Sequence, residues 1–262
     1  MIPEIFITEW QKNVRWELNE QVEQDLVICR ALVEIFNNPY LKKSVAFRGG
    51  TALHKLFLSP QPRYSEDIDL VQVDAGNIGE VLDNIRQALS FLGKPQVKLN
   101  EKMITMRFRF DSEIQPIVPL KLKIETNGRE HFTELGLIEK PFAVKSGWFT
   151  GECSIVTYKI EELLGTKLRA LYQRKKGRDL FDLYKALTLT NLDTEKLIRC
   201  YKRYMSFVVD NPPSQAEFIQ NMDLKINDAV FLNDITGLIS TNEKYDVREA
   251  YELVKERFLM TL

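Results

Sequence analysis

Two short segments in the first third of the chain carry residue types that could act on a phosphate compound. The first is Arg48-Gly49-Gly50-Thr51-Ala52-Leu53, and the second is Ser65-Glu66-Asp67-Ile68-Asp69-Leu70. A glycine pair that opens a helix offers free backbone N–H groups to a phosphate, and an alternating pair of carboxylates can hold divalent cations. Together they could hold a nucleoside triphosphate with its Mg²⁺, provided that the surrounding elements bring them together.

The acidic pair is Asp67 and Asp69. Residues i and i+2 of a strand share a face, so both carboxylates are predicted on one side, while Ile68 and Leu70 point into the core. Carboxylates about 6–7 Å apart along a strand can share two hard cations, which would bridge triphosphate oxygens and activate an attacking hydroxyl. The alternative is a strand end that faces solvent, and the apolar strand and the nearby glycine pair weaken it.

The glycine pair is Gly49 and Gly50. Glycine adopts positive φ and lets a ligand approach the backbone, and a helix beginning at Gly50-Thr51 would direct its free N–H groups at an anion. An isolated Gly-Gly-Thr is more often a plain strand-to-helix turn, and the chain has no Gly-x-x-x-x-Gly-Lys-Ser/Thr loop. The pair gains significance from the carboxylates that follow it.

Glu125 is a third candidate ligand, on a strand predicted over residues 119–126. Alternation places Lys121, Lys123 and Glu125 on one face and Leu120, Leu122 and Ile124 on the other. If this strand pairs with the strand that carries Asp67, Glu125 could complete a carboxylate triad. A solvated charged face is an equally good interpretation of the local pattern.

Lys167 interrupts the apolar stripe of a helix predicted over residues 158–172, between Leu164 and Leu168. A lysine in that position must extend to solvent, pair with an acid or contact a ligand such as a triphosphate. In the helix that follows, Asp179 suits an N-cap or first-turn position, whereas Asp182, one turn later on the same face, has no such structural explanation.

A local basic patch surrounds the end of this helix. Six positive charges fall within twelve residues: Lys167, Arg169, Arg174, Lys175, Lys176 and Arg178. The formal net charge of the whole chain is −1, so contact with a nucleic acid would have to come from such a patch. The alternative is a solvated helix end, where cations also suit the helix dipole.

The periodicity of the apolar residues predicts an α/β (α+β) chain with a mixed sheet and a helical second half. Helices are expected over residues 20–37, 51–58 and 78–92, and strands over 44–47, 68–73, 103–110 and 119–126. From about Tyr158 the patterns are nearly all helical, with one strong break at Pro212-Pro213. We expect two domains, residues 1–155 and 156–262, the second completing the active-site cleft.

The composition narrows the class of protein. The chain has 262 residues and 44% hydrophobic content, enough for one large or two small cores. Three separated cysteines, Cys29, Cys153 and Cys200, favour free thiols in a reducing cytoplasm over a zinc site or disulfides. No apolar run approaches the length of a membrane span, and the N-terminus does not look like a signal peptide, so a cytoplasmic protein without membrane contact is expected.

The combined motifs resemble the AbiEii/AbiGii toxin family and the related MenT toxins. The resemblance is carried by residues 48–53, 63–70, 167–171, 178–183 and 228–234, and it extends from about residue 20 to the end. It implies a nucleotidyltransferase fold of the DNA polymerase β type with a helical C-terminal half. It also implies a toxin of a type IV toxin–antitoxin pair that acts in abortive phage infection.

The resemblance also implies roles for individual residues. Ser65 and Asp67 match the first catalytic motif, Asp69 a second metal ligand, Lys167 the phosphate-contacting lysine and Asp182 the late essential aspartate, while Glu125 is a less certain match. We therefore expect catalytic roles for Asp67, Asp69, Lys167 and Asp182. We expect metal binding by Asp67, Asp69 and Glu125. Nucleotide binding is expected from Gly49, Gly50, Thr51, Ser65 and Lys167, and nucleic-acid binding from Arg169, Arg174, Lys175, Lys176 and Arg178.

The expected reaction is Mg²⁺- or Mn²⁺-dependent transfer of a nucleoside monophosphate from an NTP to RNA, with tRNA as the first candidate and a cognate antitoxin as a partner. Catalysis would rest on positioning and charge neutralisation. Two alternatives stay open at this point. One is a kinase that uses the same metal ligands, and the other is a non-enzymatic module that binds an antitoxin or RNA.

Overall fold

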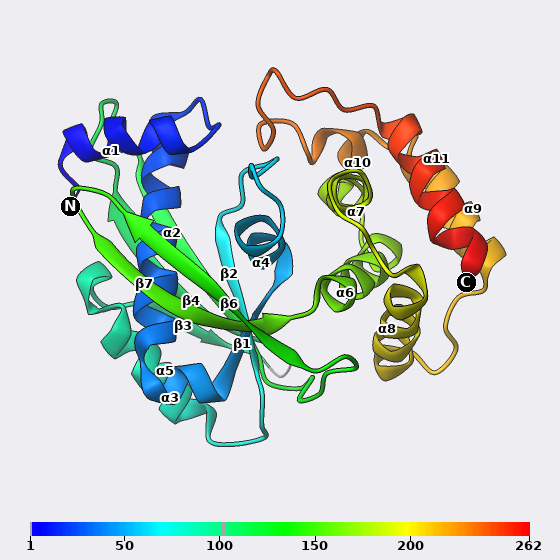
Figure 1. Cartoon of the computed structure of the whole chain (residues 1–262), viewed down its shortest axis with the longest axis horizontal. Helices are drawn as coiled ribbons and strands as arrows, with labels where there is room; N and C mark the ends of the chain where they lie inside the picture. Colours follow the sequence, from blue (N-terminus) through cyan, green and yellow to red (C-terminus); the bar gives the residue numbers. More distant parts are fainter. Residues whose placement is uncertain (1, 101–102) are drawn as a thin grey trace. The chain divides into compact units, whose positions relative to one another are not determined.

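The computed structural model describes residues 2–100 and 103–262 (Figure 1). The chain has the mixed α/β fold that the sequence predicts, and it divides into two compact units. One unit contains Met1–Phe132 and Leu137–Tyr158, and the other contains Thr133–Gly136 and Lys159–Leu262.

A seven-stranded mixed sheet forms the first unit. Its strands are β1 (Val45–Arg48), β2 (Asp67–Gln72), β3 (Gln96–Leu99), β4 (Met103–Asp111), β5 (Pro119–Asn127), β6 (Leu137–Lys145) and β7 (Thr150–Tyr158), in the order β3-β4-β5-β2-β1-β7-β6. β2 runs parallel to β5 and β1 runs parallel to β7, while the other neighbours are antiparallel. The sequence predicts β1, β2, β4 and β5 to within a residue or two.

The three strands that the sequence analysis missed lack a clear apolar alternation. β3 is an edge strand with every residue exposed. β6 is the opposite edge and contains Pro141, which is tolerated there because one side of an edge strand needs no hydrogen bonds. β7 contains Gly151, and only the pairing of its end with β1 makes it part of the core sheet. All three strands end at or before Tyr158, and the chain is helical after that residue, as predicted.

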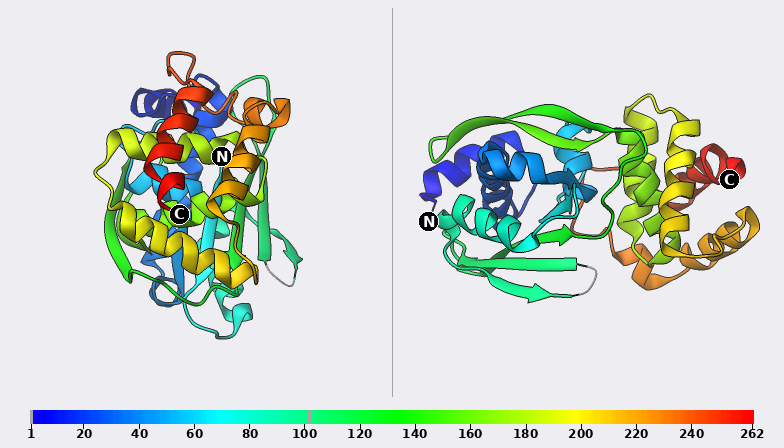
Figure 2. Two further views of the ribbon diagram at one scale, coloured as in Figure 1. Left: turned by 90° about the vertical axis from the view of Figure 1, so that its right-hand side faces the viewer. Right: turned by 90° about the horizontal axis from the view of Figure 1, so that it is seen from below.

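The helices of the first unit pack against this sheet or against the helices that cover it. They are α1 (Glu4–Trp10), α2 (Asn19–Asn37), α3 (Pro39–Ser44), α4 (Gly49–Leu56) and α5 (Ile78–Ala88), with 3₁₀ turns at Gln11–Asn13 and Ser90–Leu92. In the right-hand view of Figure 2 the outer strands β3–β4 and β6–β7 lie on opposite sides of the blue helices α1 and α2. The predicted stripe of α2 is buried, from Val22 to Phe36.

Two predicted helix boundaries were wrong. The helix expected over residues 51–58 begins at Gly49 and ends at Leu56, because the turn itself takes part in the helix. The helix expected over residues 78–92 ends at Ala88 and continues as a 3₁₀ turn to Leu92. Both errors lie at helix ends, where local patterns carry least information.

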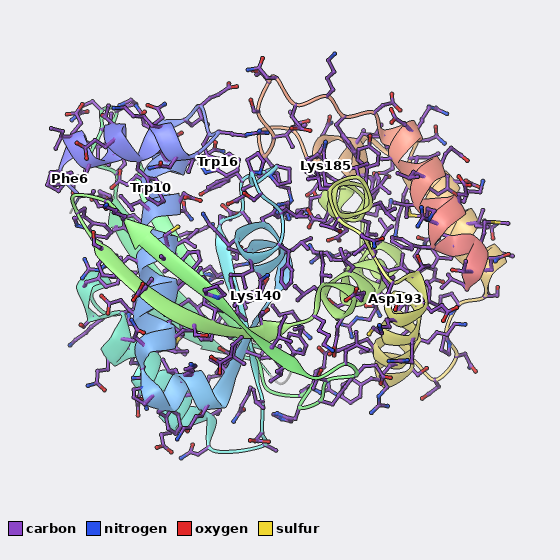
Figure 3. The ribbon with its side chains drawn as sticks, in the orientation of Figure 1. Phe6, Trp10, Trp16, Lys140, Lys185 and Asp193 are labelled. Carbon is purple, nitrogen blue, oxygen red and sulfur yellow. The ribbon has the colours of Figure 1, made fainter. Side chains whose placement is uncertain are left out.

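A buried carboxylate joins three helices of the first unit. Asp25 of α2 accepts a hydrogen bond of 3.0 Å from Trp10 Nε1 at the end of α1 and pairs with the ammonium of Lys55 in α4. Trp10 is labelled in Figure 3. Burial by itself would lower the pKa of Lys55, but Asp25 and Cys29 hold that pKa above its usual value. Asp25 therefore fixes α4, the helix that follows the glycine pair.

The second unit is helical. It contains α6 (Ile160–Gln173), α7 (Gly177–Leu189), α8 (Thr194–Val208), α9 (Gln215–Lys225), α10 (Ala229–Asn233) and α11 (Val247–Arg257), with a 3₁₀ turn at Leu259–Thr261. The predicted break at Pro212-Pro213 separates α8 from α9. Directly after it, Ser214 and Glu217 form a reciprocal capping box that begins α9.

Two further features concern the whole chain. Among the helices of residues 2–100 and 103–262, none is long and apolar enough to cross a membrane. Cys29, Cys153 and Cys200 are free thiols, and Cys29 and Cys200 are buried, as expected.

Candidate active site

The acidic pair lies on the open face of β2. Asp67 and Asp69 are half-buried, whereas Ile68 and Leu70 are 0% and 1% exposed on the opposite face. The predicted alternation is therefore confirmed, and both carboxylates point to the same side of the sheet.

Glu125 lies beside this pair because β5 is the parallel neighbour of β2. The register places Glu125 opposite Asp69 and Lys123 opposite Asp67. Neighbouring strands are about 4.8 Å apart, so the three carboxylates occupy adjacent positions on one face. The strand that carries Glu125 therefore pairs with the strand that carries Asp67, which a carboxylate triad requires.

Lys123 places a positive charge within the acidic face. Its Nζ lies 2.7 Å from Asp67 Oδ2 and 3.5 Å from Glu125 Oε2. Partial burial by itself would lower the pKa of Lys123, but the hydrogen bond to Asp67 and the charges of Asp67, Glu125 and Asp69 raise it overall. These carboxylates therefore stabilise a cation at this position.

The donor set suits a hard divalent cation, since carboxylate oxygens are the ligands that Mg²⁺ and Mn²⁺ prefer. In the described part of the chain no three acidic, histidine or cysteine side chains are gathered closely enough to enclose a metal ion as they stand. Lys123 gives the physical reason, because its ammonium occupies the space between Asp67 and Glu125. A metal ion held by Asp67 and Glu125 would take the place of these contacts with Lys123.

Gly49 brings the backbone against the same carboxylates. Its φ is +84°, and a Cβ on Gly49 would lie 2.0 Å from Asp69 Oδ2. Only glycine therefore fits between the end of β1 and Asp69. Gly50 is buried in the first turn of α4 and keeps a negative φ. Of the two glycines in the pair, Gly49 is therefore the one that needs a positive φ.

Thr51 and Ser65 connect α4 to β2 through their hydroxyls. Thr51 Oγ1 donates to the backbone carbonyl of Asp67, so it accepts the proton of Ser65 Oγ at 2.7 Å. Thr51 is 1% exposed. The structure thus gives Thr51 and Ser65 a clear positioning role, and Ser65 Oγ keeps lone pairs that can accept another hydrogen bond.

Arg48 is a residue of this face that the sequence analysis did not select. The antiparallel register of β1 and β2 places it opposite Asp69, and its guanidinium pairs with Glu130. The backbone N–H of Glu130 donates to Asn127 Oδ1 at 3.1 Å. Positive charges therefore flank the acidic pair on both sides, from Arg48 and Lys123. Predicting the order β5-β2-β1 would have revealed this.

In the helical unit, Lys167 pairs with both aspartates of α7. Its Nζ lies 3.0 Å from Asp179 Oδ1 and 2.8 Å from Asp182 Oδ2. Both aspartates are completely buried, and Lys167 is 7% exposed. Of the three options that the sequence left for Lys167, the structure shows pairing with acids, and the same contact explains Asp182.

Arg174 completes this ion cluster. Its guanidinium binds Asp179 with two hydrogen bonds, of 2.7 Å from Nε and 2.8 Å from Nη2. Burial by itself would raise the pKa of Asp179, but Lys167 and Arg174 hold that pKa below its usual value. We call Lys167, Arg174, Asp179 and Asp182 the α6–α7 ion cluster.

The other predicted nucleic-acid contacts are also partnered. Lys175 pairs with Asp228 at 2.9 Å, and Lys176 and Arg178 pair with Asp234 at 3.0 and 3.3 Å. Arg169 donates to the carbonyl of Tyr204 at 3.3 Å. Three of the six cations of this basic patch are therefore neutralised by acids more than fifty residues later, which no local pattern could reveal.

Gly177 shows how tightly the basic run is held against those acids. A Cβ on Gly177 would lie 2.2 Å from the carbonyl oxygen of Phe231 in α10. Asp228 caps α10 by accepting from the backbone N–H groups of Val230 and Phe231, and it also pairs with Lys175. The close approach of α7 and α10 thus depends on glycine at position 177.

The predicted site residues belong to two groups. Gly49, Gly50, Thr51, Ser65, Asp67, Asp69 and Glu125 gather around β2 in the first unit. Lys167, Arg169, Arg174, Lys175, Lys176, Arg178 and Asp182 lie in the second unit on α6, α7 and the segment that joins them.

Comparison with known proteins gives a family match over most of the chain. The family model described as "Nucleotidyl transferase AbiEii toxin, Type IV TA system" matches residues 30–253. That range includes every candidate site residue named above. No curated protein sequence matches the chain.

Solved structures with the same fold exist. The chain is similar to MenT4, the nucleotidyltransferase toxin Rv2826c from Mycobacterium tuberculosis H37Rv, with 17% identity and a TM-score of 0.71 over 100% of this chain and 91% of that one. It is also similar to JHP933 from Helicobacter pylori, with 18% identity and a TM-score of 0.53 over 94% of this chain and 96% of that one. Because the sequence identities are this low, the structural likeness shows a shared fold alone.

Proposed function

Because the chain belongs to the AbiEii family of nucleotidyltransferase toxins of type IV toxin–antitoxin systems, it is a nucleotidyltransferase, and we propose that its acceptor is RNA, with tRNA as the first candidate. Family membership excludes the alternative of a module without catalytic activity. The observation that carries the proposal is the open face of β2, where Asp67, Asp69 and Glu125 lie beside the Gly49 turn.

The proposed reaction joins an RNA hydroxyl to the α-phosphorus of an NTP. The hydroxyl loses its proton to solvent as its oxygen forms a new bond to the α-phosphorus, the bond from the α-phosphorus to the bridging oxygen breaks, and pyrophosphate leaves with that electron pair. Asp67, Asp69 and Glu125 would hold Mg²⁺ or Mn²⁺, which supplies the positive charge that lets the triphosphate approach this acidic face and makes the hydroxyl a better nucleophile.

Residues around β2 have proposed roles in placing the triphosphate. Gly49 and Gly50 present backbone N–H groups at the start of α4. Ser65 lies beside them, and its hydroxyl would donate to a phosphate by giving up the hydrogen bond that it donates to Thr51. Thr51 acts through its hydrogen bond to the Asp67 carbonyl and holds β2 in place. The negative charge of Asp69 next to Gly49 would repel a phosphate, which supports the proposal that a divalent cation binds with the triphosphate.

In the second unit, the resemblance assigns Lys167 to the phosphates and Asp182 to an essential role. Their ion pair supports a requirement for both residues, since each neutralises the other in a buried site. Lys175 and Lys176 are more than 40% exposed at their side chains and keep a proposed role in RNA contact, although each already pairs with one aspartate.

The biological setting is also part of the proposal. The family supports a toxin with a cognate antitoxin. We extend this to abortive phage infection in the cytoplasm, where NTPs, Mg²⁺ and tRNA are all present.

The proposal is tested by offering α-labelled and γ-labelled NTPs to the protein with Mg²⁺ and total tRNA. We expect α-label on the tRNA and none from the γ-position, and loss of transfer in EDTA that Mg²⁺ restores. Asp67→Asn should reduce the rate at least about 100-fold, the scale of losing one well-placed electrostatic group.

A matched control is Asp74→Asn, which removes the same charge from an exposed position beyond the end of β2 and should leave the rate unchanged. Transfer of γ-label would instead indicate a kinase. Full activity of Asp67→Asn would contradict the assignment of the site.

A further inference from the structure

Strands β4 and β5 carry a basic surface in which one of four cations, Lys123, pairs with acids. The antiparallel register places Arg107 opposite Lys123 and Arg109 opposite Lys121. Arg107, Arg109 and Lys121 are exposed, and together with Lys123 we call them the β4–β5 basic face. It consists of two directly opposed pairs of like charges.

This arrangement does not favour folding. Like charges directly opposite each other on neighbouring strands destabilise a sheet. In the described part of the chain, the side chains of Arg107, Arg109 and Lys121 form no ion pair with a carboxylate, unlike those of Lys175, Lys176 and Arg178 in the helical unit. Asp111 shares their face of β4 and lies at the end of the strand, opposite Pro119.

The opposite face of the same strands fixes this orientation. Met106, Phe108, Leu122 and Ile124 are all 0% exposed. A shift of one residue in either strand would place charged side chains in the core, so the basic side chains must stay on the open face. The sheet therefore fixes the face on which these basic side chains lie.

The basic face adjoins the candidate active site on one surface. β2 is the parallel neighbour of β5, with Asp67 opposite Lys123, which is opposite Arg107. At about 4.8 Å per strand, Arg107 lies on a strand roughly 10 Å from that of Asp67. A polyanion bound to β4 and β5 would thus have one end near Asp67 and Asp69.

We infer that the β4–β5 basic face binds the phosphodiester backbone of the RNA acceptor and leads its reactive end to the acidic pair. The inference rests on the proposed function for its reaction, and on charge complementarity for its binding partner. Arginine and lysine bind phosphates without reading bases, so the contact is independent of sequence and sensitive to salt.

The binding test uses the full chain and a labelled single-stranded RNA, with fluorescence anisotropy recorded over a range of NaCl concentrations. In the variant Arg107→Gln/Arg109→Gln/Lys121→Gln we expect the affinity to fall at least tenfold at low salt. The magnitude of the slope of log K against log [NaCl] should fall by about 2, since each phosphate contact on a single strand contributes roughly 0.7.

A matched control removes three exposed cations elsewhere, in the variant Lys12→Gln/Lys43→Gln/Lys202→Gln. It has the same net charge as the test variant and should keep the wild-type affinity and slope. Thermal unfolding checks the fold, and the test variant should be at least as stable as the wild type because its like-charge pairs are gone. If it does not fold, the single variant Arg109→Glu, which places an acid opposite Lys121, gives the same comparison.

The kinetic test separates this inference from the proposed function. In the test variant we expect the KM for tRNA to rise about tenfold while kcat and the Kd for Mg·NTP stay the same. Absence of α-label transfer by the wild type would refute the proposed function and leave the binding test intact. Unchanged RNA affinity and KM in the test variant, or an equal loss in the charge control, would overturn the inference.

Discussion

Gly49 and Asp69 show how single residues shape the acidic face. The structure leaves no room for a side chain at position 49, because the carboxylate of Asp69 lies where its Cβ would be. The backbone of the turn therefore contacts the acidic strand directly, and the N–H groups of α4 and the carboxylates of β2 can act on one ligand. Position 49 therefore requires glycine for two reasons, its positive φ and its close contact with Asp69.

At this scale we predict that Gly49→Ala destabilises the protein and displaces Asp69. A non-glycine residue at positive φ costs about 1–3 kcal/mol, and the contact with Asp69 adds to it. Urea unfolding should show a loss above about 2 kcal/mol in the free energy of unfolding, and NTP transfer should fall in parallel.

Gly93→Ala is the matched control. Gly93 has a φ of +77°, but no other atom lies within 4 Å of the position that a Cβ would take there. It should cost only the backbone strain and keep wild-type transfer. Equal costs for the two variants would show that the contact with Asp69 is unimportant.

Two pairs of elements hold the candidate residues by different means. α4 is tied to β2 by the hydroxyls of Ser65 and Thr51 and the carbonyl of Asp67, a neutral chain of hydrogen bonds. α6 is tied to α7 by charges, through Lys167, Asp179 and Asp182. Each contact sets the orientation of one element against its neighbour, and each can be removed with a nearly isosteric substitution.

For the α4–β2 contact, Thr51→Val keeps the shape of the side chain and removes the hydroxyl. It removes the acceptor of the buried Ser65 hydroxyl and the side-chain donor to the Asp67 carbonyl, which should cost about 1–3 kcal/mol in urea unfolding. Thr51→Ser keeps the hydroxyl and should cost less. A larger loss for Ser than for Val would mean that the methyl group, and not the hydrogen bond, is what matters.

For the α6–α7 ion cluster, Lys167→Met leaves the carboxylate of Asp182 buried without its ammonium partner. Breaking one side of such a pair costs about 3–5 kcal/mol. The double variant Lys167→Met/Asp182→Asn removes the buried charge and should recover part of that stability. NTP transfer should remain absent in both variants if Lys167 acts on the nucleotide, and should return with stability in the double variant if its role is structural only.

On the scale of the whole molecule, the chain passes between its two units three times, because residues 133–136 belong to the helical unit. Glu162 of α6 holds that segment. Its carboxylate accepts from Thr133 Oγ1, from the N–H groups of Glu134 and Leu135, and from Tyr204 Oη, all between 2.8 and 3.0 Å. One completely buried side chain thus fixes the connection between β5 and the hairpin of β6 and β7.

We expect Glu162→Ala to release this segment. Hydrogen exchange should show lost protection of the Glu134 and Leu135 amides, and unfolding should cost about 1–3 kcal/mol for the partners left without an acceptor. Glu161→Ala removes the same side chain one position earlier and serves as the control. Retained protection in Glu162→Ala would show that other contacts hold the segment.

The parts of the fold that the sequence could predict are those with a strong local period. Val22, Leu26 and Phe36 repeat with the helical period in α2, and Asp67, Ile68 and Asp69 alternate in β2, so each face was assigned correctly. The strands β3, β6 and β7 escaped because edge position, Pro141 and Gly151 weaken that alternation. Their place in the sheet depends on pairing with distant residues.

The sequence by itself determined which residues carry charge on which face, where the glycine turn and acidic pair lie, and to which family they are similar. Only the tertiary structure decided which charges meet. It set Glu125 beside Asp69, joined Lys167 to Asp182, neutralised Lys176 with Asp234, and left Arg107 and Arg109 without a carboxylate partner in the described residues. The physical reason is that periodicity is a property of neighbouring residues, whereas an ion pair depends on a distance of a few ångströms between residues that the chain separates widely.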